Sequence, residues 1–168
     1  MKISACMIAK NEEDNIAKCI SSYKDIVNEI IVVDTGSTDR TVEISEELGA
    51  KVYYFKWIND FAKAKNYAIR KAKGDWIIFL DADEYFDENK AKNIPALIKK
   101  YSKDNNEIIA CKMINIDETT GEYLADFVQT RIFKNTGNIC YVNSVHERLH
   151  SKGRKIQAVY IEENELVI

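Results

Sequence analysis

The chain contains an unbroken apolar run, Trp76 to Leu80, that ends abruptly in the acidic segment Asp81-Ala82-Asp83-Glu84. Successive aromatic and β-branched side chains cannot alternate between a core and water. The run is therefore typical of a strand that is covered on both faces, as in a parallel sheet. Ligands of such sheets bind beyond the carboxyl ends of the strands, where Asp81, Ala82 and Asp83 fall. This stretch predicts both a class of fold and the place of a site.

Further strand-like segments precede this run at short intervals. Strands are expected at residues 2–9, 30–33 and 52–55, and the second of these ends in Asp34. The segments between them have the periodicity of amphipathic helices. Alternation of this kind predicts an α/β fold, a βαβ sheet with right-handed crossovers and helices on both faces.

Residues that favour helix ends lie between the strands. Asparagine caps helices and acids favour their positive ends, so a helix is expected to start at Asn11-Glu12-Glu13-Asp14. Ser37 or Thr38 is placed to cap a second helix. A third helix is expected from Phe61 to Lys73, with Gly74 closing it.

The pattern changes after Glu84. A short helix is expected around residues 94–101, followed by strands at 108–116 and 130–133. The second half is therefore expected to be α+β. No linker or repeat marks a boundary, and 168 residues suit a single domain.

Composition narrows the class of protein. A formal charge of −3 gives no electrostatic case for a nucleic-acid partner. No apolar segment has the length needed to cross a bilayer, so the expected location is the cytoplasm, with peripheral attachment to the inner face of the membrane as an alternative. No C-x-x-C pair occurs among the cysteines, which argues against a zinc knuckle or a redox motif: Cys6, Cys19, Cys111 and Cys140.

The acids that follow two of the strands are the candidate ligands. Asp81 and Asp83, expected on the same side of an extended strand end, offer oxygen ligands to Mg²⁺ or Mn²⁺, which share their shells with substrate phosphates. The alternative is that Asp-x-Asp is a common tripeptide in a polar loop. Asp34 could accept hydrogen bonds from a base imide or a ribose, or it could support the cap of the following helix. The glycine fingerprints of dinucleotide-binding folds and P-loops are absent.

The late segment His146-Glu147-Arg148-Leu149-His150 matches the H-E-x-x-H spacing of zinc metalloproteases. In that reading the two histidines bind zinc and Glu147 is the general base. Against it, the segment lies in a strand-rich region and Gly153 follows closely, whereas the zinc motif needs a long helix. A zinc metallopeptidase is therefore the alternative function.

Four segments in this order and spacing resemble family 2 glycosyltransferases of the GT-A fold: residues 3–16, 31–41, 62–66 and 74–84. The resemblance implies a mostly parallel Rossmann-like sheet in a single domain, 1–168, with a nucleotide-sugar-binding half at 1–86 and an acceptor-side half at 87–168. It also implies inverting, metal-dependent transfer of a sugar from a nucleotide-diphosphate donor, a UDP-sugar, to an unknown glycan, lipid or protein. A domain that binds the nucleotide without catalysis, and a homo-oligomer, are open alternatives.

The resemblance assigns roles to residues of this chain. The base-contacting acid is Asp34, and the residue that matches Lys65 is usually arginine. Where threonine and tyrosine are common, this chain has Ala9 and Lys10. The implied nucleotide-sugar-binding residues are Ala9, Asn11, Glu12, Asp34, Lys65, Asp81 and Ala82.

The same resemblance places the metal and the base. Asp83 is the main ligand of Mn²⁺ or Mg²⁺, with Asp81 beside it and His146 near the metal or the diphosphate. The first candidate for the general base is Glu147 and the second is Asp126, because the family places a carboxylate after the Asp-x-Asp. The alternative for Glu147 is a surface acid paired with Arg148.

Overall fold

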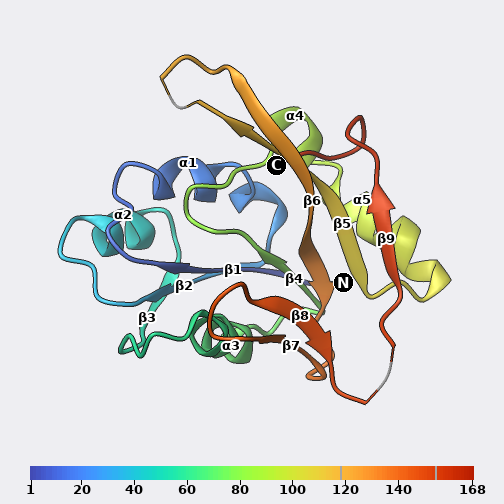
Figure 1. The fold of residues 1–168 in the computed structure, drawn as a ribbon, viewed down its shortest axis with the longest axis horizontal. Helices are drawn as coiled ribbons and strands as arrows, with labels where there is room; N and C mark the ends of the chain where they lie inside the picture. The colour runs from blue at the N-terminus through green and yellow to red at the C-terminus, as the bar shows by residue number, and fades with distance from the viewer. Residues whose placement is uncertain (118, 154) are drawn as a thin grey trace.

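The computed structural model describes residues 1–117, 119–153 and 155–168, and Figure 1 shows the arrangement of its elements. Two 3₁₀ turns occur at Lys24–Ile26 and Ser102–Asp104. The described helices and strands are β1 (Ile3–Ala9), α1 (Ile16–Ser21), β2 (Glu29–Asp34), α2 (Thr41–Glu47), β3 (Lys51–Tyr54), α3 (Phe61–Lys71), β4 (Trp76–Phe79), α4 (Glu88–Ala91), α5 (Ile94–Tyr101), β5 (Ile108–Ile116), β6 (Tyr123–Lys134), β7 (Ile139–Val142), β8 (Arg148–Ser151) and β9 (Ala158–Ile161).

A seven-stranded sheet in the order β3-β2-β1-β4-β6-β5-β9 is the centre of the fold. Strands β1 to β4 are parallel where they pair, whereas β6 runs antiparallel to both β4 and β5. Strands β7 and β8 form a separate antiparallel pair. The α/β class predicted from the alternating segments is confirmed, as is the α+β character of the second half.

Strand β4 is buried on both faces, as its apolar run predicts. Ile77 and Phe79 pack into one cluster with residues of α3 and β7. Trp76, Ile78 and Leu80 pack into the other, with residues of α1, α4 and α5. The helices therefore cover both faces of the sheet (Figure 1). None of the helices in the described ranges is long and apolar enough to span a membrane.

The expected helix start at Asn11 is wrong. Asn11 has a left-handed backbone, with φ of 57°, and α1 begins only at Ile16. Its amide oxygen accepts a hydrogen bond from the backbone N–H of Thr38 at 2.8 Å, and its own N–H donates to Ser37 Oγ at 3.0 Å. Asparagine tolerates this conformation because its side chain bonds nearby backbone. The side chain thus joins the loops after β1 and β2 instead of capping a helix.

Neither Ser37 nor Thr38 caps the second helix. Helix α2 begins at Thr41, whose N–H and hydroxyl both donate to the carboxylate of Asp39. The intervening turn is held by Asp34, which accepts the N–H groups of Gly36 and Ser37 at 3.0 and 3.1 Å. The loop after β2 is therefore longer than expected, since this acid orders it before the helix starts.

Gly74 does not close the third helix. Helix α3 ends at Lys71, and Ala72 already has an extended backbone. The reason for a glycine at position 74 is a close approach to β1, because an added Cβ would lie 2.6 Å from Ser4 Oγ and 2.7 Å from the Ser4 nitrogen. The Ser4 hydroxyl accepts the Gly74 N–H at 2.8 Å.

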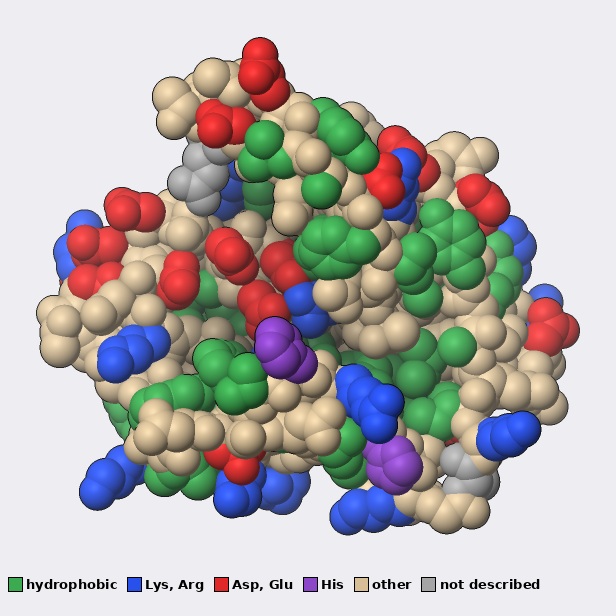
Figure 2. Space-filling view, in the orientation of Figure 1, with side chains coloured by type: hydrophobic (Ala, Val, Ile, Leu, Met, Phe, Trp, Pro, Cys, Tyr) green, Lys and Arg blue, Asp and Glu red, His purple; other side chains and the backbone are tan. Residues whose placement is uncertain are grey.

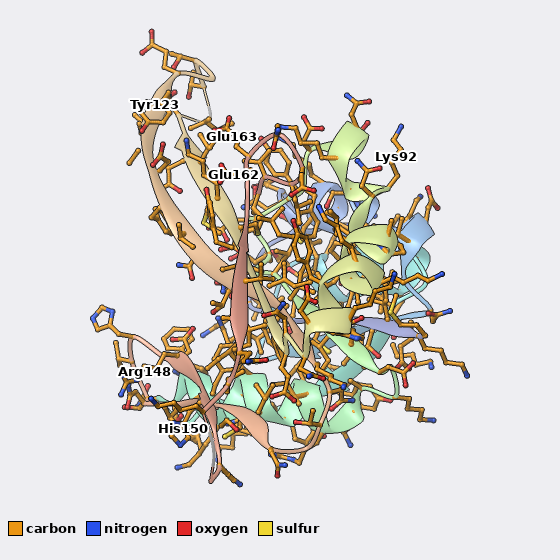
Figure 3. The ribbon with its side chains drawn as sticks, turned by 90° about the vertical axis from the view of Figure 1, so that its right-hand side faces the viewer. Lys92, Tyr123, Arg148, His150, Glu162 and Glu163 are labelled. Carbon is orange, nitrogen blue, oxygen red and sulfur yellow. The ribbon has the colours of Figure 1, made fainter. Side chains whose placement is uncertain are left out.

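Strand β6 is much longer than the expected 130–133. With β5 it forms a hairpin that projects from the body, and Tyr123 lies near its tip (Figure 3). The outer half of β6 is exposed on both faces, so it lacks the alternation that marks a half-buried strand. Ile109 pairs with Ile132 and Ala110 with Thr130, which leaves Arg131 as the extra residue of a β-bulge.

Candidate active site

A cavity of about 610 Å³ lies at the carboxyl ends of β1 and β4. The start of α3, the inner part of β6 and the loop between β7 and β8 complete its walls. Figure 2 shows acidic side chains and a histidine gathered around a hollow in this face of the molecule. The position agrees with the general rule that ligands of parallel sheets bind beyond the strand ends.

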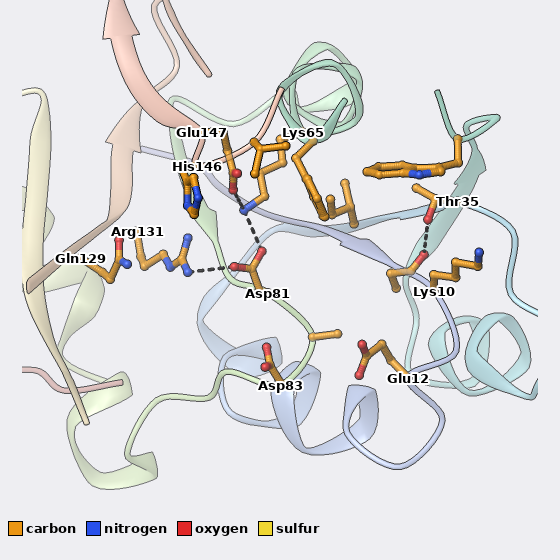
Figure 4. Close-up of a pocket in the computed structure, with 16 residues that line it drawn as sticks. Lys10, Glu12, Thr35, Lys65, Asp81, Asp83, Gln129, Arg131, His146 and Glu147 are labelled. Carbon is orange, nitrogen blue, oxygen red and sulfur yellow. Dashed lines mark hydrogen bonds and ion pairs between the residues drawn. The ribbon is translucent and has the colours of Figure 1, made fainter. Parts of the chain in front are cut away.

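Lys10, Glu12 and Thr35 line the end of the cavity next to β1 and β2 (Figure 4). Ala9 at the end of β1 and Trp57 after β3 belong to the same lining. The backbone N–H and hydroxyl of Thr35 both donate to the Ala9 carbonyl, at 3.0 and 3.2 Å, which fixes the two strand ends together. The indole of Trp57 packs edge-on against the ring of Phe61 with centroids 4.8 Å apart. Two flat aromatic surfaces therefore border this end.

Two of the residues expected to bind the nucleotide do not line the cavity. Asn11 joins the two loops, as described above, and Asp34 is only 4% exposed. Both Asp34 oxygens accept N–H groups of the following turn. Asn11 and Asp34 therefore shape the loops behind the cavity wall.

The acids after β4 form a turn, not the extended strand end that their spacing predicts. The Glu84 N–H donates to the Asp81 carbonyl at 3.0 Å, and the Asp81 N–H donates to Glu84 Oε2 at 3.0 Å. Ala82 is 4% exposed and packs into the core, whereas Asp83 is exposed and borders the cavity. The turn consequently separates Asp81 and Asp83 into different surroundings.

Asp81 is held by two cations on the cavity floor. Its Oδ1 lies 2.8 Å from Lys65 Nζ, and its Oδ2 lies 2.9 Å from Arg131 Nη2 (Figure 4). Lys65 also lies 2.6 Å from Glu147 Oε1, and Arg131 makes a second, short ion pair with Glu84. The bulge in β6 contributes the guanidinium to this network, in keeping with the tendency of bulges to redirect a side chain beside a functional site.

Burial and neighbouring charges shift the pKa values of Asp81 and Glu84 in opposite directions. Burial alone would raise the pKa of Asp81, but the charges of Arg131 and Lys65 outweigh it and hold that pKa below its usual range. Burial raises the pKa of Glu84 to about 7 against the opposing charge of Arg131, and the neighbouring Asp81 adds to the rise. The site therefore contains one firmly ionised acid and one that is protonated through mildly acidic pH.

The residues around Asp83 fit a hard divalent cation. Its exposed carboxylate makes no ion pair or hydrogen bond with any residue that the structure describes, and His146 lines the same cavity. Among the described residues, no group of three acid, histidine or cysteine side chains lies close enough together to form a complete set of metal ligands. A partial set of this kind is usual for Mg²⁺ and Mn²⁺, which take their remaining ligands from water and substrate phosphates. Both oxygens of Asp81 already pair with cations, so Asp83 is the acid of this turn whose carboxylate is open to a metal, while His146 lines the cavity on the other side of Asp81 (Figure 4).

The zinc-protease reading of His146-Glu147-x-x-His150 fails on geometry. Residues 148–151 form strand β8 rather than a helix, and His146 has a left-handed backbone with φ of 53°. His146 lines the cavity, whereas His150 is exposed on β8 and does not (Figure 3). The i, i+4 spacing brings two side chains together only on a helix.

The two candidate bases are placed very differently. Glu147 lines the cavity and its side chain is 17% exposed. Asp126 lies on the projecting part of β6, where it pairs with Lys112 at 2.8 Å and accepts the Tyr123 hydroxyl at 3.2 Å, outside the cavity lining. Only Glu147 is therefore in reach of a molecule bound in the cavity.

Several further residues of the lining lie in no motif, among them Trp57, Phe61 and Gln129. Trp57 and Phe61 precede or begin α3, and Gln129 follows the long exposed part of β6. The aromatic pair around the α3 start is a signal that could have pointed to a ligand, since aromatic side chains that are partly exposed offer a large flat contact surface. Gln129 offered no such signal, because its position depends on the pairing of β6 with β5.

Comparison with known proteins places this geometry in context. The family model described as glycosyl transferase family 2 matches residues 4–155. The chain is 36% identical over 146 residues to the TPR repeat-containing protein Synpcc7942_0270 of Synechococcus elongatus, covering 87% of this chain and 35% of that protein. It is 38% identical over 151 residues to the SPbeta prophage-derived glycosyltransferase SunS of Bacillus subtilis, covering 86% and 34%. The chain thus spans about a third of the length of these two curated relatives.

Solved structures share the fold. The crystal structure of S. aureus TarS 1-349 in complex with UDP-GlcNAc superposes with a TM-score of 0.67 at 21% identity, covering 96% of this chain and 58% of that one. Glucosyl-3-phosphoglycerate synthase from Mycobacterium tuberculosis, solved with Mn²⁺, UDP and glucosyl-3-phosphoglycerate, gives a TM-score of 0.55 at 23% identity, covering 67% and 44%. At these identities the likeness establishes the GT-A fold.

Proposed function

The chain belongs to glycosyl transferase family 2, and from that premise we propose that it transfers a sugar from a UDP-sugar to an acceptor nucleophile with inversion at the anomeric carbon. The observation that carries the proposal is that the Asp81-Ala82-Asp83 turn and the carboxylate of Glu147 line the same cavity. An anionic turn suits a metal-bound diphosphate, and a second carboxylate suits a base for the acceptor.

The donor would occupy the end of the cavity bordered by Trp57, Lys10 and Thr35. A flat aromatic surface can stack on a nucleobase, and a lysine can meet a phosphate. UDP as the nucleotide is supported by the UDP complex of TarS and the UDP complex of the mycobacterial synthase. Asp34 and Asn11 would contribute by holding the loops behind this end, with Glu12 on the cavity side.

Asp83 would be the main ligand of a divalent cation, Mn²⁺ or Mg²⁺, and His146 is a second candidate ligand from another wall of the cavity. When bound there, the cation would neutralise the charge that develops on the departing diphosphate. The mycobacterial synthase was solved with Mn²⁺. In this chain, the support is the carboxylate of Asp83, which has no partner among the described residues, and the chemistry of oxygen and imidazole donors.

Glu147 would act as the general base. Inversion requires the acceptor to attack the anomeric carbon from the face opposite the leaving diphosphate. The bond from that carbon to the acceptor forms, the bond to the phosphate oxygen breaks, and the acceptor proton passes to the Glu147 carboxylate. Positioned general bases typically contribute about 10²–10⁴-fold to a rate. Asp126 is not included, because it lies outside the cavity.

Ligand-dependent thermal stability tests the donor side. UDP, GDP and CDP are titrated with and without Mn²⁺, and UDP with Mn²⁺ is expected to raise the melting temperature by about 5–10 °C at a hundredfold excess over Kd. Asp83→Ala should abolish the shift. The control Asp25→Ala, an exposed acid of the 3₁₀ turn at Lys24–Ile26, should keep it. No nucleotide shift in the wild type would refute the proposal.

Hydrolysis of UDP-GlcNAc and UDP-glucose, in which water replaces the acceptor, tests the chemical step through the UDP that it releases. Glu147→Gln should reduce turnover by at least about 100-fold while UDP affinity is retained. Asp126→Asn should leave turnover unchanged. Nucleotide binding without release of UDP in the wild type would instead identify a binding domain without catalysis.

A further inference from the structure

Lys65 lies at the meeting point of the two halves of the cavity. It comes from the second turn of α3, yet its ammonium reaches Asp81 after β4 and Glu147 after β7. We infer that Lys65 is a positioning residue that holds these two carboxylates in place, and that it does not contact the nucleotide. The inference rests on the proposed function, since it assigns Lys65 to the positioning of the base in that same site.

The surroundings of the ammonium leave it little freedom. Lys65 is 2% exposed, compared with 7% for Arg131, the other buried cation of the cavity. Its Nζ lies 2.8 Å from Asp81 Oδ1 and 2.6 Å from Glu147 Oε1, and the rings of Phe79 and Tyr141 lie 5.4 and 5.3 Å away. Removing one partner of such a buried pair leaves a charge uncompensated. If Lys65 moved toward a phosphate, Glu147 would lose the cation that it pairs with in the described structure, whereas Asp81 would keep Arg131.

The elements that carry Lys65 and Glu147 are joined independently of the ion pair. The Asn66 side chain donates to the Tyr141 carbonyl at 2.8 Å and accepts the Tyr141 N–H at 2.9 Å. The N–H of Phe61 donates to the Ser144 carbonyl at 3.0 Å. Helix α3 and the approach to the β7–β8 loop are thus held in register, and Lys65 fixes the acid at the end of that loop.

The two carboxylate oxygens of Glu147 have different contacts. Oε1 is held by Lys65, whereas Oε2 has no hydrogen bond or ion pair within the described ranges and remains open to an acceptor proton. The two oxygens of Asp81 pair with Lys65 and Arg131, respectively. One ammonium therefore orients the base and keeps Asp81 from competing with Asp83 for a cation.

The two roles for Lys65 predict opposite results for Lys65→Met, which keeps the length of the side chain and removes the charge. A nucleotide contact would make calorimetric binding of UDP with Mn²⁺ at least tenfold weaker. If Lys65 is a positioning residue, the Kd stays within about threefold of the wild type, or becomes lower because Lys65 no longer competes with the metal for Asp81. The rate of UDP release from UDP-GlcNAc nevertheless falls by about 100-fold or more. Binding weakened tenfold, or turnover unchanged, overturns the inference.

Two control variants accompany the measurement. Lys65→Arg keeps a cation that can reach both carboxylates and should restore turnover to within about tenfold of the wild type. Lys63→Met removes a charge from the same helix, but Lys63 is 66% exposed and pairs with Asp60 outside the cavity lining. It should behave as the wild type in both assays.

Amide hydrogen exchange of the free protein separates this inference from the proposed function. The amide to follow is that of Phe61, which donates to the Ser144 carbonyl of the β7–β8 loop at 3.0 Å. If Lys65 anchors this loop, the Phe61 amide should exchange at least about tenfold faster in Lys65→Met than in Lys63→Met, while β1 and β4 stay protected. Equal exchange of the Phe61 amide in the two variants refutes the positioning role. A wild type that binds no UDP refutes the proposed function, and the exchange comparison still decides the role of Lys65.

Discussion

Replacement of Glu84 by glutamine should remove a pH dependence from the stability of the fold. The Glu84 side chain is 12% exposed and lies between Arg131 and the backbone of Asp81. Burial raises its pKa to about 7, opposed by the charge of Arg131 and assisted by that of Asp81. Glutamine keeps the shape and can still accept the Asp81 N–H, but it has no proton to release.

The size of the effect follows from the two pKa values. A carboxyl group with a higher pKa in the folded protein than in the unfolded chain stabilises the fold most at low pH, and that stability is lost as pH rises through the folded value. From the ordinary value of 4.5 to about 7, at about 1.4 kcal/mol per pH unit, the total loss is about 3 kcal/mol. Between pH 5 and 8 it is about 2–3 kcal/mol.

Urea unfolding at pH 5, 6, 7 and 8, at constant ionic strength and with a chelator present, measures this loss. The free energy of unfolding of the wild type should fall by about 2–3 kcal/mol more than that of Glu84→Gln over this range. The two histidines are common to both proteins and cancel in the difference. The low pKa of Asp81 places its own titration below this range. Parallel curves for the two proteins would show that Arg131 keeps Glu84 ionised at pH 5 and would refute the reasoning.

Two further substitutions test the packing of the sheet. Gly74→Ala should lower the free energy of unfolding by about 1–3 kcal/mol, because the new Cβ would lie 2.7 Å from the Ser4 backbone nitrogen, which cannot move without distorting β1. An unchanged midpoint of urea unfolding would contradict this close approach. Tyr141→Phe should leave stability unchanged or raise it by up to about 1 kcal/mol, since the buried hydroxyl has no hydrogen-bond partner in the described structure; a clear loss in the same assay would point to a partner for that hydroxyl.

The features that the sequence predicted are those governed by local pattern. The apolar run at β4, the alternation of strands and helices, and the acids at the strand end all follow from residues within a few positions of one another. The helix at Ile94–Tyr101 and the strand at Ile108–Ile116 were predicted at their observed bounds. Periodicity and burial act over such short distances, so they can be recognised without the fold.

The features that were missed depend on partners distant in the chain. Asn11 looks like a helix cap until Thr38 is seen to donate to it, and Gly74 looks like a helix stop until Ser4 is placed beside it. The outer part of β6 has no periodic pattern because β5 alone supports it. The contact of Lys65 with Glu147 needs α3 and the β7–β8 loop to be neighbours, which no local pattern indicates.

The junction between β4 and β6 has a consequence for recombination among relatives. The two strands pair through only three positions, Trp76 with Lys134, Ile77 with Phe133 and Ile78 with Ile132. All of the sheet before this ladder is parallel and comes from the first 79 residues. A chimera that exchanges the segment after β4 for that of a relative must match this short ladder and the Asn66 bonds to Tyr141 of β7. The fold is therefore expected to tolerate a crossover at this junction better than one inside the parallel strands.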